Sequence, residues 1–278
     1  MTACVSGKAA GDLNMSSAET KDGKPSPKML KVICCGVAVR EVCHVVARSK
    51  NFVDLEFLEQ GYHDTPAKGH DVIQERVNAI PAGRYDAILL GYGLCSNMIV
   101  GLTTPHTPVV VPRAHDCITF FLGSKERYQQ TFSAHPGTYY YTSGWLECWK
   151  RSGMHTPSQG GTGMEPRCEA GQWEQKYGED EARYLREVMR EWSQSYTRGA
   201  LIDFDFSKHL NLAADVQHIC ADRGWKFEEI TGDISLLQRW VDGDWASKDF
   251  VIVHPNEKVV ATCDERVVDV QKAGQTGG

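Results

Sequence analysis

Several features of membrane proteins and nucleic-acid-binding proteins are missing from this sequence. It has no run of about 18 apolar residues that could span a bilayer, and no segment near its N-terminus is typical of an export signal. Its 36 acidic residues outnumber its 30 basic ones, and no stripe of Lys and Arg could follow a phosphate backbone. We therefore expect a cytoplasmic protein that binds a small-molecule substrate, with neither a membrane nor a nucleic acid as a partner.

A complete dinucleotide-binding fingerprint is missing as well. Gly91 and Gly93 match the first two glycines of G-x-G-x-x-G, but Ser96 occupies the third position. The backbone amides near Ser96 and Asn97 can still hold an anion if a helix begins there. The segment is therefore interpreted as a ligand-binding loop and not as a dinucleotide site.

Cysteine, in contrast, is abundant, with ten residues in a chain of 278. A disulfide framework is typical of small secreted proteins, whereas this chain is long and carries cysteines inside apolar, strand-like runs. A reducing compartment fits this pattern better. We interpret most of the cysteines as buried thiols and a few as ligands.

The alternation of apolar segments predicts an α/β fold with a parallel, Rossmann-like or flavodoxin-like sheet. Short apolar runs bounded by Gly or Pro are typical of buried strands, and segments with helical spacing separate them. The predicted strands are Leu30–Gly36, Val53–Leu58, Tyr85–Gly93, Thr107–Pro112, Ala200–Phe204, Trp225–Ile230 and Phe250–Val253, and the predicted helices are Val39–Arg48, Thr65–Ile80, Glu179–Ser195, Leu212–Arg223 and Ile234–Val241.

The same pattern indicates one large α/β domain or two similar lobes with a cleft between them. Residues 1–28 and 266–278 are polar, without apolar periodicity, and are predicted to be disordered tails. Residues 29–143 form the first predicted lobe, which carries the candidate site, and residues 179–265 form the second. Between the lobes, residues 144–178 mix Gly, Pro, Trp and Cys without a clear period, so we interpret them as an irregular loop or lid.

Reactive side chains follow three of the predicted strands. Cys35 closes the first strand, Cys95 follows the glycine turn of the third, and His115 and Cys117 follow the fourth. In a parallel sheet the carboxyl ends of the strands lie at one edge, where ligands bind. Imidazole and thiolates are good ligands for zinc or another transition metal, and three protein ligands leave one position open for a substrate. We therefore predict one metal or small-ligand site at this edge.

Other residues near these segments are assigned supporting roles. Cys35 or Cys148 could supply a fourth metal ligand, Asp116 could orient His115, and Arg113 could hold an acidic group of the substrate. The alternative is ordinary packing, because Cys is among the most buried residue types and His-x-Cys occurs often by chance. The remaining candidate substrate-binding residues are Tyr92, Asn97, Ser143 and Trp145.

Several short motifs of the chain occur in an order known from one protein family. They are Gly91–Cys95, Pro112–Ile118, Phe121–Ser124, Pro136–Tyr140, Ser143–Trp145, Gly232–Asp233, Leu236–Leu237 and Gly243–Trp245. In these motifs the chain resembles the uncharacterised family called DUF1638, although Ser96 stands where glycine is usual. The resemblance implies an association with corrinoid-dependent methyl transfer in one-carbon metabolism. A corrinoid protein or a methyltransferase is therefore an expected partner, and a corrinoid is a second candidate cofactor.

Three functions are open at this stage. The first is a metal-binding protein that transfers methyl groups to or from a thiol or a corrinoid, with zinc at Cys95, His115 and Cys117. The second is a non-catalytic corrinoid- or metal-binding accessory protein. The third is a metal-free enzyme that uses Cys95 or Cys117 as its nucleophile and His115 as its base.

Overall fold

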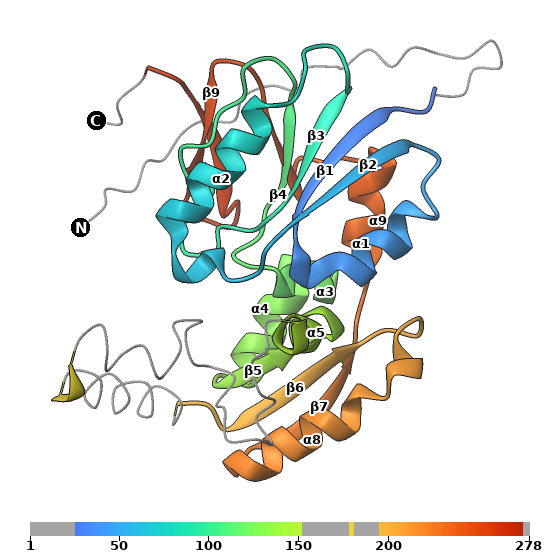
Figure 1. Cartoon of the computed structure of the whole chain (residues 1–278), viewed down its shortest axis with the longest axis vertical. Helices are drawn as coiled ribbons and strands as arrows, with labels where there is room; N and C mark the ends of the chain where they lie inside the picture. The colour runs from blue at the N-terminus through green and yellow to red at the C-terminus, as the bar shows by residue number, and fades with distance from the viewer. Residues whose placement is uncertain (1–25, 152–177, 181–194, 275–278) are drawn as a thin grey trace.

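The protein has a mixed α/β architecture with a mostly parallel central sheet, as the sequence predicts (Figure 1). The computed structural model describes residues 26–151, 178–180 and 195–274. The central sheet has five strands in the order β2-β1-β3-β4-β8. Its parallel strands are β1 (Met29–Cys35), β2 (Phe52–Leu58), β3 (Ala87–Gly91) and β4 (Val109–Pro112), and β8 (Phe250–Val253) pairs antiparallel with β4.

Helices cover both faces of the central sheet, because successive side chains of its buried strands point to opposite faces. On one face, Val42 of α1 and Trp240 of α9 join Val32 in one core cluster. On the other face, Ile73 of α2 joins Ile33 in a second cluster. The bounds of these helices are α1 (Val39–Val46), α2 (Pro66–Asn78) and α9 (Ser235–Asp242).

A smaller sheet has three parallel strands in the order β5-β6-β7. Figure 1 shows the helices α3, α4 and α5 between the two sheets, and α8 on the outer side of the smaller one. The elements of this part are α3 (Ile118–Leu122), α4 (Lys125–Ala134), β5 (Thr138–Tyr141), α5 (Ser143–Arg151), β6 (Arg198–Asp203), α8 (Leu212–Arg223) and β7 (Lys226–Thr231). Further elements are the short helices η1 (Gly36–Ala38), η2 (Tyr62–Asp64) and η4 (Lys208–Leu210) and the hairpin of β9 (Glu257–Ala261) and β10 (Val268–Lys272).

The arrangement corrects the predicted division into a lobe at 29–143 and a second lobe at 179–265. β5, from the first predicted lobe, pairs with β6 in the smaller sheet. In return, α9 and β8, from the second predicted lobe, complete the central sheet and its core. An apolar run such as Phe250–Val253 can be buried in either sheet, so its pattern does not specify the partner strand.

Two segments predicted to be irregular contain regular structure. Val268 is fully buried and β10 pairs with β9, so residues 266–274 are not a disordered tail. Residues 144–151 belong to the helix α5 and not to an irregular lid. The rest of the predicted lid, most of the predicted helix at 179–195 and residues 1–25 of the predicted N-terminal tail lie outside the described residues.

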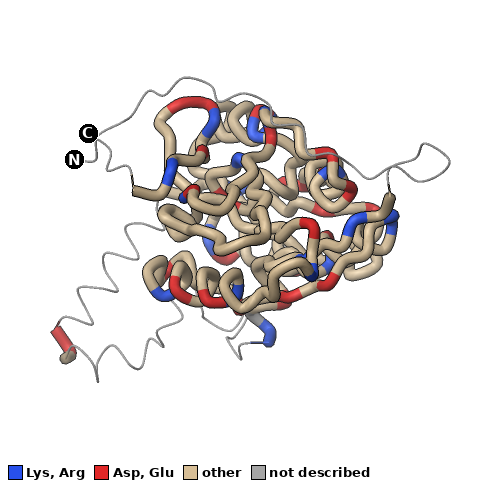
Figure 2. Tube along the Cα trace, turned by 90° about the horizontal axis from the view of Figure 1, so that it is seen from above, with Lys and Arg blue, Asp and Glu red and all other residues tan. Residues whose placement is uncertain are grey.

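Charges of both signs are interspersed along the described trace (Figure 2). A protein that follows a phosphate backbone concentrates Lys and Arg on one face. The part of the chain drawn in Figure 2 shows no such concentration. No helix within the described ranges is long and apolar enough to cross a membrane.

Candidate functional site

The two motif segments lie side by side at the carboxyl ends of β3 and β4. The Leu94 N–H donates to the carbonyl of Ala114 at 2.9 Å, and the Cys95 N–H donates to the carbonyl of His115 at 2.9 Å. Gly93 permits this approach, since a Cβ there would lie 2.8 Å from the backbone nitrogen of Asp116. The structure thus brings Gly91–Cys95 and the segment after β4 to one place.

A left-handed turn presents the Cys95 side chain. Cys95, Ser96 and Asn97 have φ angles of 44°, 62° and 64°. Each non-glycine residue in this region costs about 1–2 kcal/mol, and such conformations persist only where the surrounding structure enforces them. The two hydrogen bonds to residues 114 and 115 provide part of that restraint. Asn97 is exposed at the outside of this turn and lines none of the cavities described below.

Three cysteine thiols meet at a small cavity on this edge of the sheet. Cys35 ends β1, Cys95 follows β3 and Cys117 follows β4, and all three line a cavity of about 40 Å³. Their strands are neighbours in the central sheet, in the order β1-β3-β4. A cavity of this size has room for one water molecule or one metal ion.

Burial disfavours the thiolate form of Cys95 and Cys117. It raises the pKa of Cys95 to about 12, and it raises the pKa of Cys117 well above its ordinary value. The Asp116 carboxylate and the neighbouring thiols raise both values further, because each of them disfavours a second negative charge nearby. A thiolate forms here when a cation, such as a metal ion, offsets these effects.

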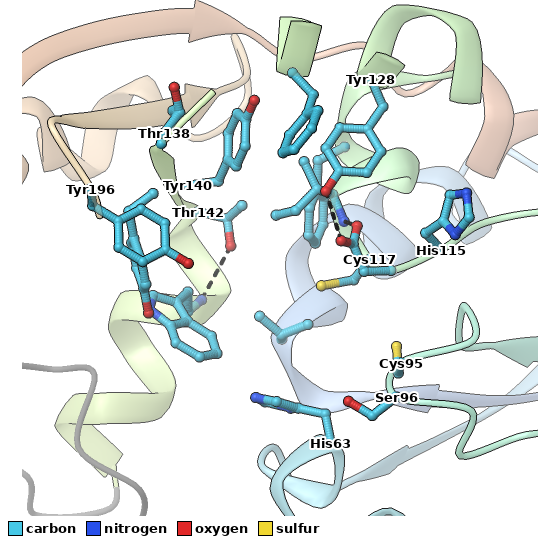
Figure 3. A pocket seen from close by; sticks show the side chains of 18 of the residues that line it. His63, Cys95, Ser96, His115, Cys117, Tyr128, Thr138, Tyr140, Thr142 and Tyr196 are labelled. Atoms are coloured by element: carbon cyan, nitrogen blue, oxygen red, sulfur yellow. Dashed lines mark hydrogen bonds between the residues drawn. The ribbon is translucent and has the colours of Figure 1, made fainter. Parts of the chain in front are cut away.

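The structure changes which imidazole belongs with the three thiols. His63, in η2, lines the small cavity, whereas His115 is exposed and lines only wider cavities. Figure 3 shows His115 turned away from Cys95 and Cys117. The predicted His115–Cys117 pair diverges because the backbone at Cys117 is already helical, so residues two apart do not share a side. As they stand, no three His, Cys, Asp or Glu side chains among the described residues form a group that could hold a metal ion.

A larger cavity of about 630 Å³ opens beside the thiols. Cys95 and Cys117 line both cavities. In Figure 3, Tyr196 and Thr142 lie on one side of the larger cavity and Tyr128 on the other. The smaller sheet therefore supplies one wall, and α4 supplies the opposite one. The volume is within the range of small-molecule sites.

The Asp116 carboxylate accepts a hydrogen bond from Tyr128 and not from His115. Its Oδ1 accepts from the Ile118 N–H at 3.0 Å, and its Oδ2 accepts from the Tyr128 hydroxyl at 2.8 Å. Burial raises the pKa of Asp116, and the hydrogen bond from Tyr128 opposes this shift. Burial and the charge of Asp116 also raise the pKa of Tyr128. The predicted contact from Asp116 to His115 is therefore replaced by an Asp116–Tyr128 pair at the cavity wall.

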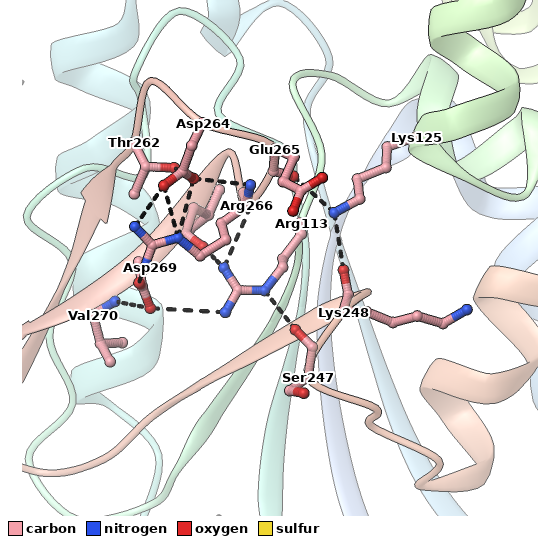
Figure 4. Close-up of polar contacts among 11 residues, drawn as sticks. Arg113, Lys125, Ser247, Lys248, Thr262, Asp264, Glu265, Arg266, Asp269 and Val270 are labelled. Atoms are coloured by element: carbon pink, nitrogen blue, oxygen red, sulfur yellow. Dashed lines mark hydrogen bonds and ion pairs between the residues drawn. The ribbon is translucent and has the colours of Figure 1, made fainter. Parts of the chain in front are cut away.

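Arg113 lines neither cavity, which corrects its predicted role in holding a substrate (Figure 4). Its Nε donates to the carbonyl of Ser247 at 2.7 Å, and its Nη1 donates to the carbonyls of Arg266 at 3.3 Å and of Val268. Its Nη2 lies 3.7 Å from Oδ1 of Asp269. Burial lowers the pKa of Arg113, and Asp269 opposes that shift. The side chain ties the end of β4 to β10 and to the loop before β8.

The other predicted residues divide between the cavities and the core. Trp145 lines both cavities, and Tyr92 lines the small one, where its buried hydroxyl has no hydrogen-bond partner among the described residues. Ser143 is buried, and its hydroxyl donates to Oε1 of Glu41 at 3.1 Å. Cys148 is buried in α5 and lines neither cavity. Trp145 and Tyr92 are therefore placed to contact a ligand, whereas Ser143 and Cys148 are not.

Several cavity residues have no conspicuous sequence signal. His63 follows β2, Tyr128 lies on α4 and Tyr196 precedes β6. The position of His63 after a strand next to β1 is the one usable indication. Tyr196 reaches the site only because β6 pairs with β5, which the pattern of apolar residues does not specify.

The fold and the site together define a mixed α/β protein with a thiol-lined cavity at the carboxyl edge of its parallel sheet. A family model described as a protein of unknown function (DUF1638) matches residues 57–241, and the chain belongs to this family. The matched segment contains Cys95, His115 and Cys117, whereas Cys35 precedes it. No curated protein and no solved structure matches the chain.

Proposed function

We propose that this protein binds a thiophilic metal ion, with zinc as the first candidate, through Cys35, Cys95 and Cys117. A small molecule in the larger cavity would then reach the open position of the ion. The observation that carries this proposal is the convergence of three thiols, from three adjacent strands, on one cavity that adjoins a ligand-sized one. The strand order β2-β1-β3-β4 also supports a flavodoxin-like core, in which ligands bind at the carboxyl ends of the strands.

The side chains at the small cavity are of the types that bind such an ion. Three cysteine sulfurs suit zinc and other thiophilic metals, and His63 is available as a fourth ligand or can be replaced by substrate. The thiols must rotate toward one another, since no metal-holding group is present among the described side chains as they stand. Because burial raises the pKa of Cys95 and Cys117, metal binding must release their protons and should tighten as pH rises.

Methyl transfer is the reaction that we propose for this centre. A thiol bound to zinc is held as a thiolate at neutral pH and is more nucleophilic toward methyl donors. The residues of this chain would orient the second reactant, with Trp145 and Tyr128 against its apolar parts. The methyl group would pass between the sulfur of a substrate thiol, bound at the open position of the ion, and a corrinoid protein or a methyltransferase.

The metal-free alternative receives less support from the site. A nucleophilic cysteine needs a lowered pKa, whereas the pKa of Cys95 and that of Cys117 are raised. His115, the predicted base, turns away from both thiols. A non-catalytic accessory role uses the same metal or corrinoid site and differs only in the absence of turnover.

Metal analysis of the purified full chain tests the proposal. We expect about one zinc per chain after loading, lost in Cys95→Ser and Cys117→Ser variants that remain folded. Cys43→Ser is the matched control, because Cys43 is an exposed thiol of α1 outside both cavities.

The outcome also separates the alternatives. Zinc that binds equally to the Cys117→Ser variant would refute the site. Protein that takes up no metal and whose Cys95 reacts rapidly with iodoacetamide at neutral pH would favour the metal-free enzyme. For a metal-binding chain, methyl transfer from a methylated corrinoid to a thiol separates an enzyme from an accessory protein.

A further inference from the structure

The described lining of the larger cavity contains an acidic side chain but neither Lys nor Arg. The acidic side chain is the carboxylate of Asp116. Two arginines act on lining residues from behind the wall: Arg198 lowers the pKa of Tyr140 and is paired with Glu228, and Arg223 lowers the pKa of Tyr139. Besides the Asp116 carboxylate, the titratable side chains of the described lining are the imidazoles of His63 and His115 and several thiol and phenol groups, so a ligand with a negative charge would meet no permanently charged basic group there.

Aromatic rings contribute to both walls of this cavity. On one side, Tyr139 lies 5.4 Å from Tyr196 and 6.4 Å from Trp145 between ring centroids. On the other side, Tyr128 lies 6.4 Å from Phe132 of the same helix, and it also lies 6.2 Å from Tyr140, which belongs to β5 of the smaller sheet. All of these residues line the cavity. Figure 3 shows Tyr196 and Tyr128 on opposite sides of the open space.

Such walls favour one class of ligand. The face of an aromatic ring carries negative partial charge and attracts cations, and an ammonium group that carries methyl groups loses little hydration when it leaves water. A carboxylate at the same wall adds to the attraction for a positive charge. Asp116 is such a carboxylate, held in place by the Tyr128 hydroxyl. An aromatic cavity with these charges therefore distinguishes a cation from a neutral molecule of the same shape.

We propose that the larger cavity binds a quaternary ammonium compound, with its methylated head between the two aromatic walls. This inference names the substrate class of the cavity in the proposed function and rests on it for the identity of the site. The volume of about 630 Å³ exceeds that of a trimethylammonium head, so the rest of the molecule also has room.

Calorimetric binding of choline to the full chain tests the charge requirement. The control ligand is 3,3-dimethyl-1-butanol, which has the shape of choline but no charge. We expect choline to bind at least about tenfold more tightly than this alcohol, and tetramethylammonium to compete with it. Equal affinities, or no binding of choline at millimolar concentration, would overturn the proposal.

Variants locate the binding. Tyr140→Leu and Tyr196→Leu should each weaken choline binding by about three- to tenfold. Asp116→Asn should reduce the preference for choline over the alcohol. Tyr85→Leu is the control, because Tyr85 lies outside both cavities. If both leucine variants in the cavity bind choline with full affinity, the aromatic walls are not the site.

Metal content measured on the same samples separates this inference from the proposed function. Choline binding without any metal would leave the cation site standing and refute the metal centre. Metal binding that depends on Cys117, together with no binding of choline, would support the metal centre and refute the cation site.

Discussion

The network around Arg113 and the cavity beside Cys117 lie a few residues apart on one segment, yet their polar groups are in opposite states. Arg113 has hydrogen bonds to three backbone carbonyls and an ion pair with Asp269. Near the thiols, the hydroxyls of Tyr92, in the small cavity, and of Tyr140, in the larger one, are buried without a hydrogen-bond partner among the residues that the structure describes. Buried polar groups normally find partners, and exceptions call for an explanation such as a bound ligand. The comparison indicates that the Arg113 region stabilises the fold, and it supports the proposal that the cavities bind a ligand.

The largest effect that separates the two regions is expected from Arg113→Met. This change removes the charged donor of three backbone carbonyls, of which that of Val268 is buried, and one of the two arginines beside Asp269, so the free energy of unfolding should fall by about 3–5 kcal/mol. Chemical denaturation measures this loss. Arg84→Met is the control, since Arg84 is 60% exposed and 3.7 Å from Asp54, and its removal should leave the free energy of unfolding nearly unchanged. A folded Arg113→Met chain with unchanged stability and lost ligand binding would reverse the assignment.

The next effect concerns Glu41, a buried carboxyl group whose oxygens are only half satisfied. Oε1 accepts from Ser143, whereas Oε2 has no partner within the described ranges, and burial raises the pKa of Glu41 from 4.5 to about 7. Below pH 4.5 the group is protonated in both the folded and unfolded states. As pH rises from 4.5 toward 7 the unfolded state ionises first, so this group should remove roughly 3 kcal/mol of stability.

The test for Glu41 compares unfolding curves across that pH range. The loss should be present in the parent chain and absent from Glu41→Gln. In Ser143→Ala the loss should extend to higher pH, because the hydrogen bond from Ser143 lowers the pKa of Glu41. Parallel curves for the parent chain and the Glu41→Gln variant would show that the carboxyl group does not behave as a buried acid.

The smallest effect on stability is expected at Gly93. A Cβ in Gly93→Ala would lie 2.8 Å from the nitrogen of Asp116 and 2.9 Å from the oxygen of Ala114, so the two segments must separate. We expect a loss of about 1–3 kcal/mol in the free energy of unfolding and faster alkylation of Cys95, measured by peptide mass spectrometry.

Gly83→Ala serves as the control for that experiment. Gly83 has a φ of 72° with open space around it, so the substitution should cost about 1–2 kcal/mol without changing the alkylation of Cys95. If Gly93→Ala also leaves the rate of alkylation unchanged, the contact between the two segments does not protect the thiol.

The strand ends of the central sheet were the most predictable part of this protein. Apolar runs bounded by Gly and Pro mark β1, β3 and β4, and their parallel arrangement places Cys35, Cys95 and Cys117 together. The direction of individual side chains was not predictable in the same way. His115 turns away from the thiols because of the backbone conformation after it, and Arg113 lies outside both cavities because its partners are distant in the sequence.

The aromatic wall was the least predictable part. Tyr139 and Tyr140 stand in a recognisable strand, but their place in the site depends on the pairing of β5 with β6, about sixty positions along the chain. Local patterns report burial and periodicity, whereas long-range pairing depends on the energy of the whole fold.

The antiparallel strand β8 has a consequence for how the protein is made. β4 gains its second neighbour from a segment that leaves the ribosome long after β4 itself. Until then, Val109–Val111 presents an apolar strand edge that can pair with another chain. Nascent molecules therefore pass through a period of aggregation risk, which ends only when β8 docks and closes the edge.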